Sequence, residues 1–379
     1  MKLPFWQHPN CKVAAFVLAP AILAAVLLLL EGHLVHGGER SQSASSIIST
    51  SHHIVEIAEF DIGSLTGARS SASGGGIAFD RATGEYLLVR PNGEIYRFRF
   101  ASDGKHLELA DTGMQVPINH ESFAADNIGI ASGDAFRVAD VLILGDDADR
   151  RILVSHHYWL SDQSCFVVRL SQHAFPQMTR SERISESQDA WTTLFESTPC
   201  LPVGLNRGTA FAGVQIGGNL ELAPTGRILF AVGDHQFDGW YRARNLVEDM
   251  TSEYGKVISI DPSSGDYEIF TTGHRNPQGL VVTESGQIWE TEHGPQGGDE
   301  LNLLSAGRNY GYPFHSLGTE YGGVTWPPGN QTDLDTAIKV SPVYAWIPSI
   351  GISDLIEING SDFPRWRGNL LVAALRDKA

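Results

Sequence analysis

The sequence is poor in charged residues, and those that it has are mainly of one sign. Only 19% of the 379 residues are charged, and 27 basic residues stand against 44 acidic ones, giving a formal net charge of −17. Such a surface repels a phosphate backbone, so we expect no nucleic-acid partner. Carboxylates and carbonyls are the ligands that Ca²⁺ prefers, so the same composition is compatible with a calcium site.

Several common motifs are also missing. The sequence has no phosphate-binding loop, no dinucleotide fingerprint, no zinc-type spacing of Cys and His, and no G-x-S-x-G nucleophile elbow. Sustained helical periodicity is scarce, and this argues against a helical bundle.

Cysteine is scarce, with three residues in the whole chain. Cys11 precedes an apolar run, so that only Cys165 and Cys200 lie in the body of the protein. In an oxidising compartment, neighbouring strands can bring these two residues together in a disulfide. Two buried free thiols are the alternative.

One long apolar run is present, close to the N-terminus. Lys2 and Lys12 precede the 18 uncharged residues Val13–Leu30. This length reaches the lower limit of a membrane span, and no small-x-small cleavage site follows it. We expect residues 1–37 to be a signal anchor with a transmembrane helix that leaves the body facing the periplasm or the cell exterior. A cleaved export signal is the alternative.

The rest of the chain divides into a tether and an all-β body. Residues 38–53 are rich in Ser, Gly and polar side chains, a composition typical of a flexible linker. From residue 54 onward, apolar runs are bounded by Gly, Pro, Asp and Asn. Together with the 40 glycines of the chain, this pattern predicts many short strands joined by tight turns over 54–379.

The body contains a loose repeat of apolar strand, polar turn and apolar strand. The clearest copies are 75–89, 217–232 and 279–292, and weaker ones are 138–157 and 355–375. One unit takes about 40–70 residues, a period typical of propeller blades. Four units and half of a fifth are present, and an open ring would expose strand edges. We therefore predict a β-propeller that is C-terminally incomplete.

Residues suited to ligand binding are concentrated in GHRNPQGL (273–280) and EHGPQGGDELNLLSAGRNYGYP (292–313). The glycines let backbone carbonyls turn toward an ion, and Asp299 and Glu300 add negative charge that suits Ca²⁺. Arg275 offers a planar fork for carboxylates. The alternative is that Arg275 and Asp299 merely cross-link blades.

These two stretches resemble the glucose/sorbosone dehydrogenase family, soluble aldose sugar dehydrogenases that use pyrroloquinoline quinone (PQQ) on a six-bladed propeller. Further matches are GGNLELAPTGRILFAVGD (217–234), YGKVISIDP (254–262) and FPRWRGNLLVAAL (363–375). The resemblance implies a six-bladed β-propeller that oxidises an aldose or a related sugar with PQQ and Ca²⁺. It names neither the sugar nor the electron acceptor.

The resemblance also implies roles for cofactor-binding residues. Arg275 and Asn276 would contact the quinone and its carboxylates, and Arg376 falls where the family places a basic residue against the cofactor. Other basic residues of the family's final blade lie beyond the last residue of this sequence.

Two calcium sites are implied in the same way. The carbonyls of Gly294 and Pro295 would bind the Ca²⁺ that bridges to PQQ. Glu300, with the backbone of Tyr310, would help to hold a second, structural Ca²⁺.

One catalytic position departs from the family's pattern. The family has a histidine before its GG-x-L strand, and that histidine takes the sugar hydroxyl proton; here VQIGGNL places Gln215 there. Glutamine is no useful proton acceptor at neutral pH, and loss of a general base typically costs about 10²–10⁴-fold in rate. His235, one strand further on, is a candidate substitute.

Other functions stay open. Gln215 favours a non-catalytic propeller that binds other proteins, although the two intact motifs argue against it. A Ca²⁺-dependent lactone hydrolase would need a cage of Glu, Asn and Asp side chains around the axis, which the sequence does not supply. Trp240 and Tyr241 would line a sugar cleft or pack within a blade. Of the neighbours His156 and His157, we expect one to lie at the surface and one to be packed.

Overall fold

The computed structural model describes most of the chain from residue 74 onward and the backbone of four short strands before it. The ranges described in full are 74–102, 106–128, 135–146, 149–175, 184, 190–204, 211–319, 339–361 and 363–375. The short strands are β1 (Val13–Ala14), β2 (Ser41–Gln42), β3 (Ala44–Ser49) and β4 (Ile54–Glu59). Strands dominate these residues, and a single short helix, α2 (His120–Asp126), is described among them.

Consecutive strands pair into antiparallel sheets, which we call blades 1 to 5. Blade 1 holds β5 (Gly76–Asp80), β6 (Glu85–Val89), β7 (Glu94–Phe100) and β8 (His106–Gln115), with β2 at its edge. Blade 2 holds β9 (Val138–Leu144), β10 (Arg151–Leu160), β11 (Cys165–Ala174) and β12 (Thr192–Glu196), with β13 (Leu201–Pro202) paired to β11. Blade 3 holds β14 (Gly217–Leu222), β15 (Ile228–Val232), β16 (Lys256–Ile260) and β17 (Tyr267–Thr272), with β21 (Arg308–Asn309) parallel to β17.

The last two blades follow the same order. Blade 4 holds β18 (Pro277–Val282), β19 (Ile288–Glu292), β20 (Asp299–Leu304) and β22 (Tyr344–Trp346). Blade 5 holds β23 (Ile352–Glu357) and β24 (Leu370–Ala374), with β1 parallel to β24. The backbones of β3 and β4 form a separate pair.

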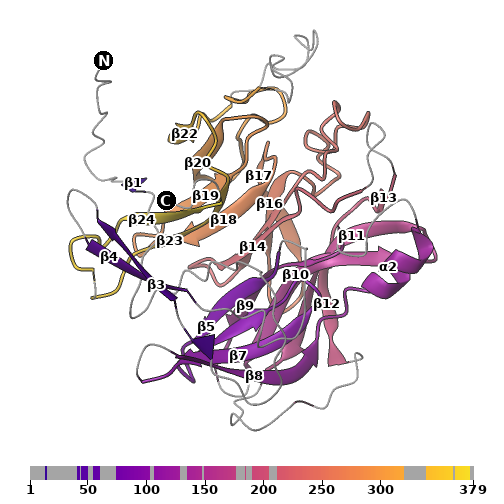
Figure 1. Cartoon of the computed structure of the whole chain (residues 1–379). Coiled ribbons are helices and arrows are strands. Elements are labelled where there is room, and N and C mark those ends of the chain that lie inside the picture. Colours follow the sequence, from indigo (N-terminus) through magenta and orange to yellow (C-terminus); the bar gives the residue numbers. More distant parts are fainter. Residues whose placement is uncertain are drawn as a thin grey trace, which may run out of the picture.

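Neighbouring blades meet through their first strands. β5 packs against β9, β9 against β14, β14 against β18, and β18 against β23. Figure 1 shows the blades side by side in chain order, from the purple strands of blade 1 to the yellow strands of blade 5. Antiparallel sheets that follow one another in this way form a β-propeller. The predicted all-β propeller is therefore confirmed, while the six-blade count and the incomplete C-terminus stay predictions.

The core lies between the blades, because several strands bury both faces. On β15 all five residues are buried: Ile228, Phe230 and Val232 pack toward blade 2, and Leu229 and Ala231 pack toward blade 4. Successive side chains of a strand point to opposite faces, so this uninterrupted apolar run supplies two interfaces at once. Similar clusters lie between blades 1 and 2 and between blades 4 and 5.

The repeat seen in the sequence corresponds to the first hairpin of a blade. Gly84, Gly226 and Gly286 occupy the same place in the polar turns of blades 1, 3 and 4, with φ of 70°, 79° and 81°. Side chains rarely adopt this left-handed conformation, whereas glycine does so freely. The turn chemistry is therefore part of the repeat.

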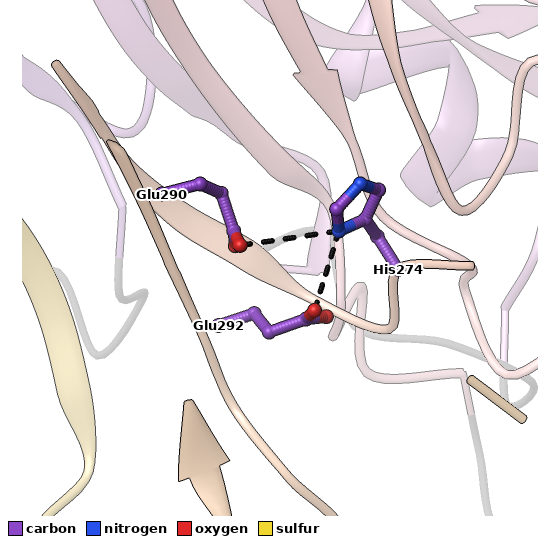
Figure 2. A group of neighbouring side chains, drawn as sticks. All are labelled: His274, Glu290 and Glu292. Carbon is purple, nitrogen blue, oxygen red and sulfur yellow. Dashed lines mark hydrogen bonds and ion pairs between the residues drawn. The ribbon is translucent and has the colours of Figure 1, made fainter. Parts of the chain in front are cut away.

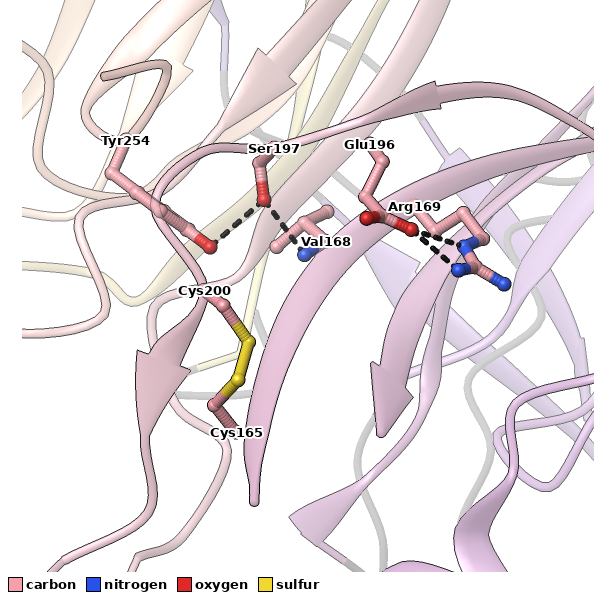
Figure 3. The surroundings of a disulfide bond; sticks show 7 residues. All are labelled: Cys165, Val168, Arg169, Glu196, Ser197, Cys200 and Tyr254. Atoms are coloured by element: carbon pink, nitrogen blue, oxygen red, sulfur yellow. Dashed lines mark hydrogen bonds and ion pairs between the residues drawn. A yellow bond between two sulfur atoms is a disulfide. The ribbon is translucent and has the colours of Figure 1, made fainter. Parts of the chain in front are cut away.

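A disulfide joins Cys165, at the start of β11, to Cys200, with 5.7 Å between the Cα atoms (Figure 3). Beside it, the Ser197 hydroxyl accepts a hydrogen bond from the Val168 amide at 2.9 Å and donates to the Tyr254 hydroxyl at 2.8 Å. These contacts fasten the segment after β12 to blade 2 and connect it to blade 3.

The prediction for the paired histidines of β10 is wrong in one respect. His156 and His157 do point to opposite faces, yet both are completely buried, since blade 2 is covered on each side. His156 contacts the carbonyl of His157 and the Ser171 hydroxyl, each at 2.8 Å.

Most of the predicted membrane anchor lies outside the described residues. Of Val13–Leu30, only Val13–Ala14 is described, as β1. Among the described residues, no helix has the length and apolar character needed to cross a bilayer. β2 and β3 fall within 38–53, where their backbones pair with β8 and β4.

Candidate functional site

The candidate site begins where the chain passes from blade 3 to blade 4. β17 ends at Thr272, and Gly273 turns the chain with φ of 77°. A Cβ atom on Gly273 would overlap the side chain of Asn309 and the backbone of Gly311. Only glycine therefore fits at this turn, which delivers the next three residues to the end of the blade.

Arg275 spans from this turn to the loop that follows β19. Its Nη1 donates to the carbonyl oxygens of Gly294 at 2.8 Å and of His293 at 3.2 Å. Its backbone amide donates to the Glu292 carboxylate at 2.6 Å. The side chain is buried. The structure thus brings Arg275 and Gly294, predicted to share a site, into direct contact.

The loop 293–298 is tightly folded. A Cβ atom on Gly294 would overlap the carbonyl oxygens of Gly297 and Gly298, so the loop closes only around a glycine. Pro295 is buried, with its ring lying close to Gly318. The loop backbone that carries the carbonyls of Gly294 and Pro295 is consequently fixed in position.

Asp299 anchors this loop to blade 5. Its carboxylate accepts hydrogen bonds from the Ser349 hydroxyl at 2.7 Å and from the amides of Gly351 at 2.8 Å and Ile352 at 3.2 Å. It also accepts one from the Gly294 amide at 3.2 Å. For Asp299 the cross-linking alternative therefore describes the structure, since its oxygens serve to join blades.

Asn276 and Gln215 lie where blades 3 and 4 meet. The side-chain oxygen of Asn276 accepts from the Gly217 amide at 3.1 Å, and Gln215 is two residues before that glycine. Gln215 is 8% exposed and has φ of 61°. Its side-chain oxygen is buried without a hydrogen-bond partner. Gln215 thus combines a strained backbone with an unpaired amide oxygen, two residues before the glycine that contacts Asn276.

His235 is deeply enclosed. Its Nε2 lies 3.0 Å from Nε2 of His157, and its ring packs against Phe166 and Tyr254. Burial lowers the pKa of His235 to about 3. A base with so low a pKa holds a proton weakly at neutral pH, and its ring is already engaged with another histidine. These observations argue against His235 as the substitute base.

Sequence reasoning missed a buried acidic pair beside Arg275. The Asp234 amide donates to the Arg275 carbonyl at 2.9 Å, and the Asp238 carboxylate accepts from the Tyr312 hydroxyl at 2.8 Å. Burial, and then the charge of Asp238, raises the pKa of Asp234 well above its ordinary value, while Arg275 opposes this shift. The signal available in the sequence was Asp234 in VGD, which follows the buried strand β15 after a single glycine.

The residues of the expected structural calcium site come from neighbouring segments. Glu300 is buried on β20, directly opposite Glu292 in the register. The Tyr310 hydroxyl donates to the Leu303 carbonyl at 2.7 Å, and its ring stacks on His274. Burial, followed by the charge of Glu292, raises the pKa of Glu300 to about 8. Arg376 lies outside the described residues.

Trp240 and Tyr241 belong to the packing at the end of blade 3. Both are partly buried and pack against Val247 and Tyr312. Their backbone amides donate to the Asp238 carboxylate at 2.8 Å and 2.7 Å.

The arrangement fits an anionic ligand bridged by a cation. The Arg275 guanidinium supplies a fork for a carboxylate, and the side chain of Asn276 lies on the same short segment. A carbonyl oxygen has two lone pairs, so the Gly294 oxygen keeps one beyond its bond to Arg275. The orphaned Gln215 oxygen adds an acceptor. These donors and acceptors suit PQQ with Ca²⁺.

Comparison with known proteins identifies related chains. The family model described as Glucose / Sorbosone dehydrogenase matches residues 204–379. Aldose sugar dehydrogenase YliI of Escherichia coli (strain K12) is 30% identical over 212 residues, covering 52% of this chain and 52% of that protein. Quinoprotein glucose dehydrogenase B of Acinetobacter calcoaceticus is 29% identical over 164 residues, covering 36% and 34%. The chain thus spans about half the length, or less, of these curated relatives.

Two solved structures share the fold. The soluble aldose sugar dehydrogenase from Escherichia coli in its apo-form has a TM-score of 0.61 and 24% identity, covering 81% of each chain. The PQQ-bound aldose sugar dehydrogenase from Streptomyces coelicolor has a TM-score of 0.53 and 19% identity, covering 82% of this chain and 75% of that one. At these identities the likeness establishes the fold alone.

Proposed function

The stretch 204–379 belongs to the glucose/sorbosone dehydrogenase family, and from this we propose that the protein is a PQQ- and Ca²⁺-dependent oxidoreductase that oxidises an aldose or a related sugar. The observation that carries the proposal is the contact between Arg275 and the Gly294 carbonyl, with a hydrogen bond of 2.8 Å. It joins the two motifs of the family's cofactor site at one place in this fold. The names of the relatives support the choice of a sugar as substrate.

Each residue of the site has a defined task in this proposal. Arg275 binds a carboxylate of the cofactor through its guanidinium, and Asn276 orients the cofactor from the same turn. The carbonyl oxygens of Gly294 and Pro295 hold Ca²⁺. The chemistry that calcium-bound PQQ supplies in such enzymes is acceptance of a hydride from the sugar.

In the proposed reaction, the step that the site residues support least is removal of the sugar hydroxyl proton. The side-chain oxygen of Gln215 accepts a hydrogen bond from a sugar hydroxyl and so orients it, but the amide does not take up the proton. We therefore propose a slow enzyme, in which the sugar hydroxyl proton passes to water, a poorer acceptor than imidazole.

The test uses the full chain, titrated with PQQ in the presence and absence of Ca²⁺, followed by dye reduction with a panel of aldoses. We expect Ca²⁺-dependent PQQ binding and slow sugar-dependent reduction. Arg275→Ala should weaken PQQ binding by at least about tenfold, because it removes a charge-assisted hydrogen bond. The control is Arg227→Ala, in the turn between β14 and β15 of blade 3, and it should bind PQQ as the parent does. Absence of PQQ binding would remove the proposal.

A second candidate function is a non-catalytic propeller that binds other proteins. Gln215 in place of a catalytic histidine is the observation that favours it. PQQ affinity without any sugar-dependent dye reduction would support this alternative, whereas measured sugar oxidation would exclude it.

We further propose that the body is exported and held at a membrane by the N-terminal segment. The apolar run Val13–Leu30 supports the anchor, and the bond between Cys165 and Cys200 supports an oxidising compartment. In fractionated cells the chain should remain with the membranes after a salt wash, with its body open to external protease. A chain found in the cytoplasmic fraction would contradict this.

A further inference from the structure

A compact group of metal-ligating side chains lies behind the Arg275 site. Among the described residues, His274, Glu290 and Glu292 offer three ligand atoms that all lie within 4.8 Å of one another. Figure 2 shows the two carboxylates converging on the same ring nitrogen. Nδ1 of His274 is 3.2 Å from Glu292 and 3.9 Å from Glu290. All three residues are buried.

The strand register explains why these side chains meet. Glu290 and Glu292 are two residues apart on β19, so they point to the same face of blade 4. Asn302 lies opposite Glu290 on β20, and its amide nitrogen donates to Glu290 at 2.9 Å and to Glu292 at 3.2 Å. His274 reaches the group from the turn before β18, with its ring stacked on Tyr310.

Outer contacts orient the ligand atoms inward. Nε2 of His274 lies 2.9 Å from the Thr271 hydroxyl, which leaves Nδ1 directed at the two glutamates. The second oxygen of Glu292 accepts the Arg275 amide at 2.6 Å. Histidine and carboxylate ligands in metal sites are held by such outer hydrogen bonds, which fix the tautomer and the ring orientation.

Two polar atoms of the group lack partners. One carboxylate oxygen of Glu290 and the side-chain oxygen of Asn302 have no hydrogen-bond partner, and both residues are completely buried. Buried acceptors left unpaired are costly, and two carboxylates brought together in a buried group also need a compensating positive charge. A cation would satisfy both requirements. Rotation of the Asn302 amide would turn its oxygen toward the cation as a further ligand.

We propose that His274, Glu290 and Glu292, with Asn302, form a binding site for one first-row divalent metal ion, with Zn²⁺ as the ion that fits best. One nitrogen and several oxygens match zinc, whereas Ca²⁺ takes oxygen ligands. With bonds of about 2.0–2.2 Å in a tetrahedron, ligand atoms lie about 3.4 Å apart, close to the separations seen here. The site adjoins the expected structural calcium site, because Glu300 lies directly opposite Glu292 in the register, but it uses other side chains and is independent of sugar oxidation. A bound ion would fix the segment that connects blade 3 to blade 4.

The test is binding of Zn²⁺ alone to the full chain after treatment with a chelator. We expect one tightly bound Zn²⁺ per chain by equilibrium dialysis and metal analysis, and a higher Tm with Zn²⁺ than without. Glu290→Gln should weaken Zn²⁺ binding by at least about tenfold and abolish the Tm shift. The matched control is Glu253→Gln, a buried glutamate outside the group whose carboxylate accepts from the Thr198 amide and the Tyr267 hydroxyl, and it should keep the bound Zn²⁺.

Three results would overturn the proposal. The first is absence of stoichiometric Zn²⁺ binding by the parent. The second is equal Zn²⁺ binding by the parent and Glu290→Gln. The third is equal loss of binding in Glu290→Gln and Glu253→Gln, which would show a general effect of neutralising a buried glutamate. If the parent binds no Zn²⁺ and Glu290→Gln has a higher Tm than the parent, the two glutamates share a proton in place of a metal ion. Co²⁺ used in place of Zn²⁺ provides a spectroscopic readout, because a histidine ligand alters its visible absorption.

Discussion

Gln215 is the residue on which turnover depends in the proposed function. Its backbone has φ of 61° and its carbonyl accepts a hydrogen bond from the His235 amide at 3.3 Å, which fixes the backbone here to the segment that follows β15. Its buried oxygen has no hydrogen-bond partner. The side chain thus occupies an enclosed place, and the chemistry available there depends on the residue type.

The first prediction concerns this side chain. Gln215→His should raise sugar-dependent dye reduction by about 10²–10⁴-fold, because imidazole accepts a proton near neutral pH and an amide does not. The measurement is kcat with PQQ and Ca²⁺ at saturating aldose. Gln215→Asn keeps an amide and should give no gain. Unchanged kcat in the histidine variant, with PQQ still bound, would contradict a missing general base.

At the scale of an element, the loop between β19 and β20 does two jobs. Asp299 fixes its end to blade 5 through the amides of Gly351 and Ile352. Gly294 lets it fold back on itself and leaves a carbonyl toward Arg275. Asp299 thus positions the part of the loop that we propose to bind the ligand.

The second prediction concerns the space inside this loop. Gly294→Ala should weaken Ca²⁺-dependent PQQ binding by more than about tenfold, because the added methyl group overlaps two carbonyl oxygens and displaces the loop. PQQ titration is the measurement. The control is Gly204→Ala, where a Cβ atom would meet only the end of the Arg242 side chain, at 3.3 Å. Equal PQQ affinity in the two variants would show that the loop position does not matter.

At the scale of the whole molecule, close packing of blades buries groups that titrate near neutral pH. Burial lowers the pKa of His156 to about 4, against about 6.5 in an unfolded chain. Between these values the unfolded chain binds more protons, so the contribution of His156 to stability is present above pH 6.5 and is lost as the pH falls toward 4. Buried carboxyls act in the opposite direction; burial raises the pKa of Glu221 to about 7.

The third prediction isolates the histidine contribution. The free energy of unfolding of His156→Gln should fall less steeply than that of the parent between pH 6.5 and 4, by up to about 1.4 kcal/mol per pH unit. Because opposing groups are common to both chains, the difference between their urea-unfolding curves is the quantity to measure. Parallel curves across this range would mean that His156 is not held neutral in the fold.

The sequence by itself determined the strands, their turns and the order of the blades. Runs such as ILFAV on β15 specify burial on both faces, and the glycine of each polar turn, as in Gly226, specifies where the chain reverses. The motifs at 273–280 and 292–313 indicated the candidate site, because their glycines, acidic residues and Arg275 lie close together in the sequence.

Only the tertiary structure decided which side chains meet. The pairing of His157 with His235 and the convergence of His274 with Glu290 join residues from different strands, and a shift of one position in register would have turned Glu290 to the other face of its blade. Whether His156 lies exposed or enclosed depends on the neighbouring blade and not on its own strand. Such contacts depend on how strands pack against one another, and the residue order within a single strand does not specify that packing.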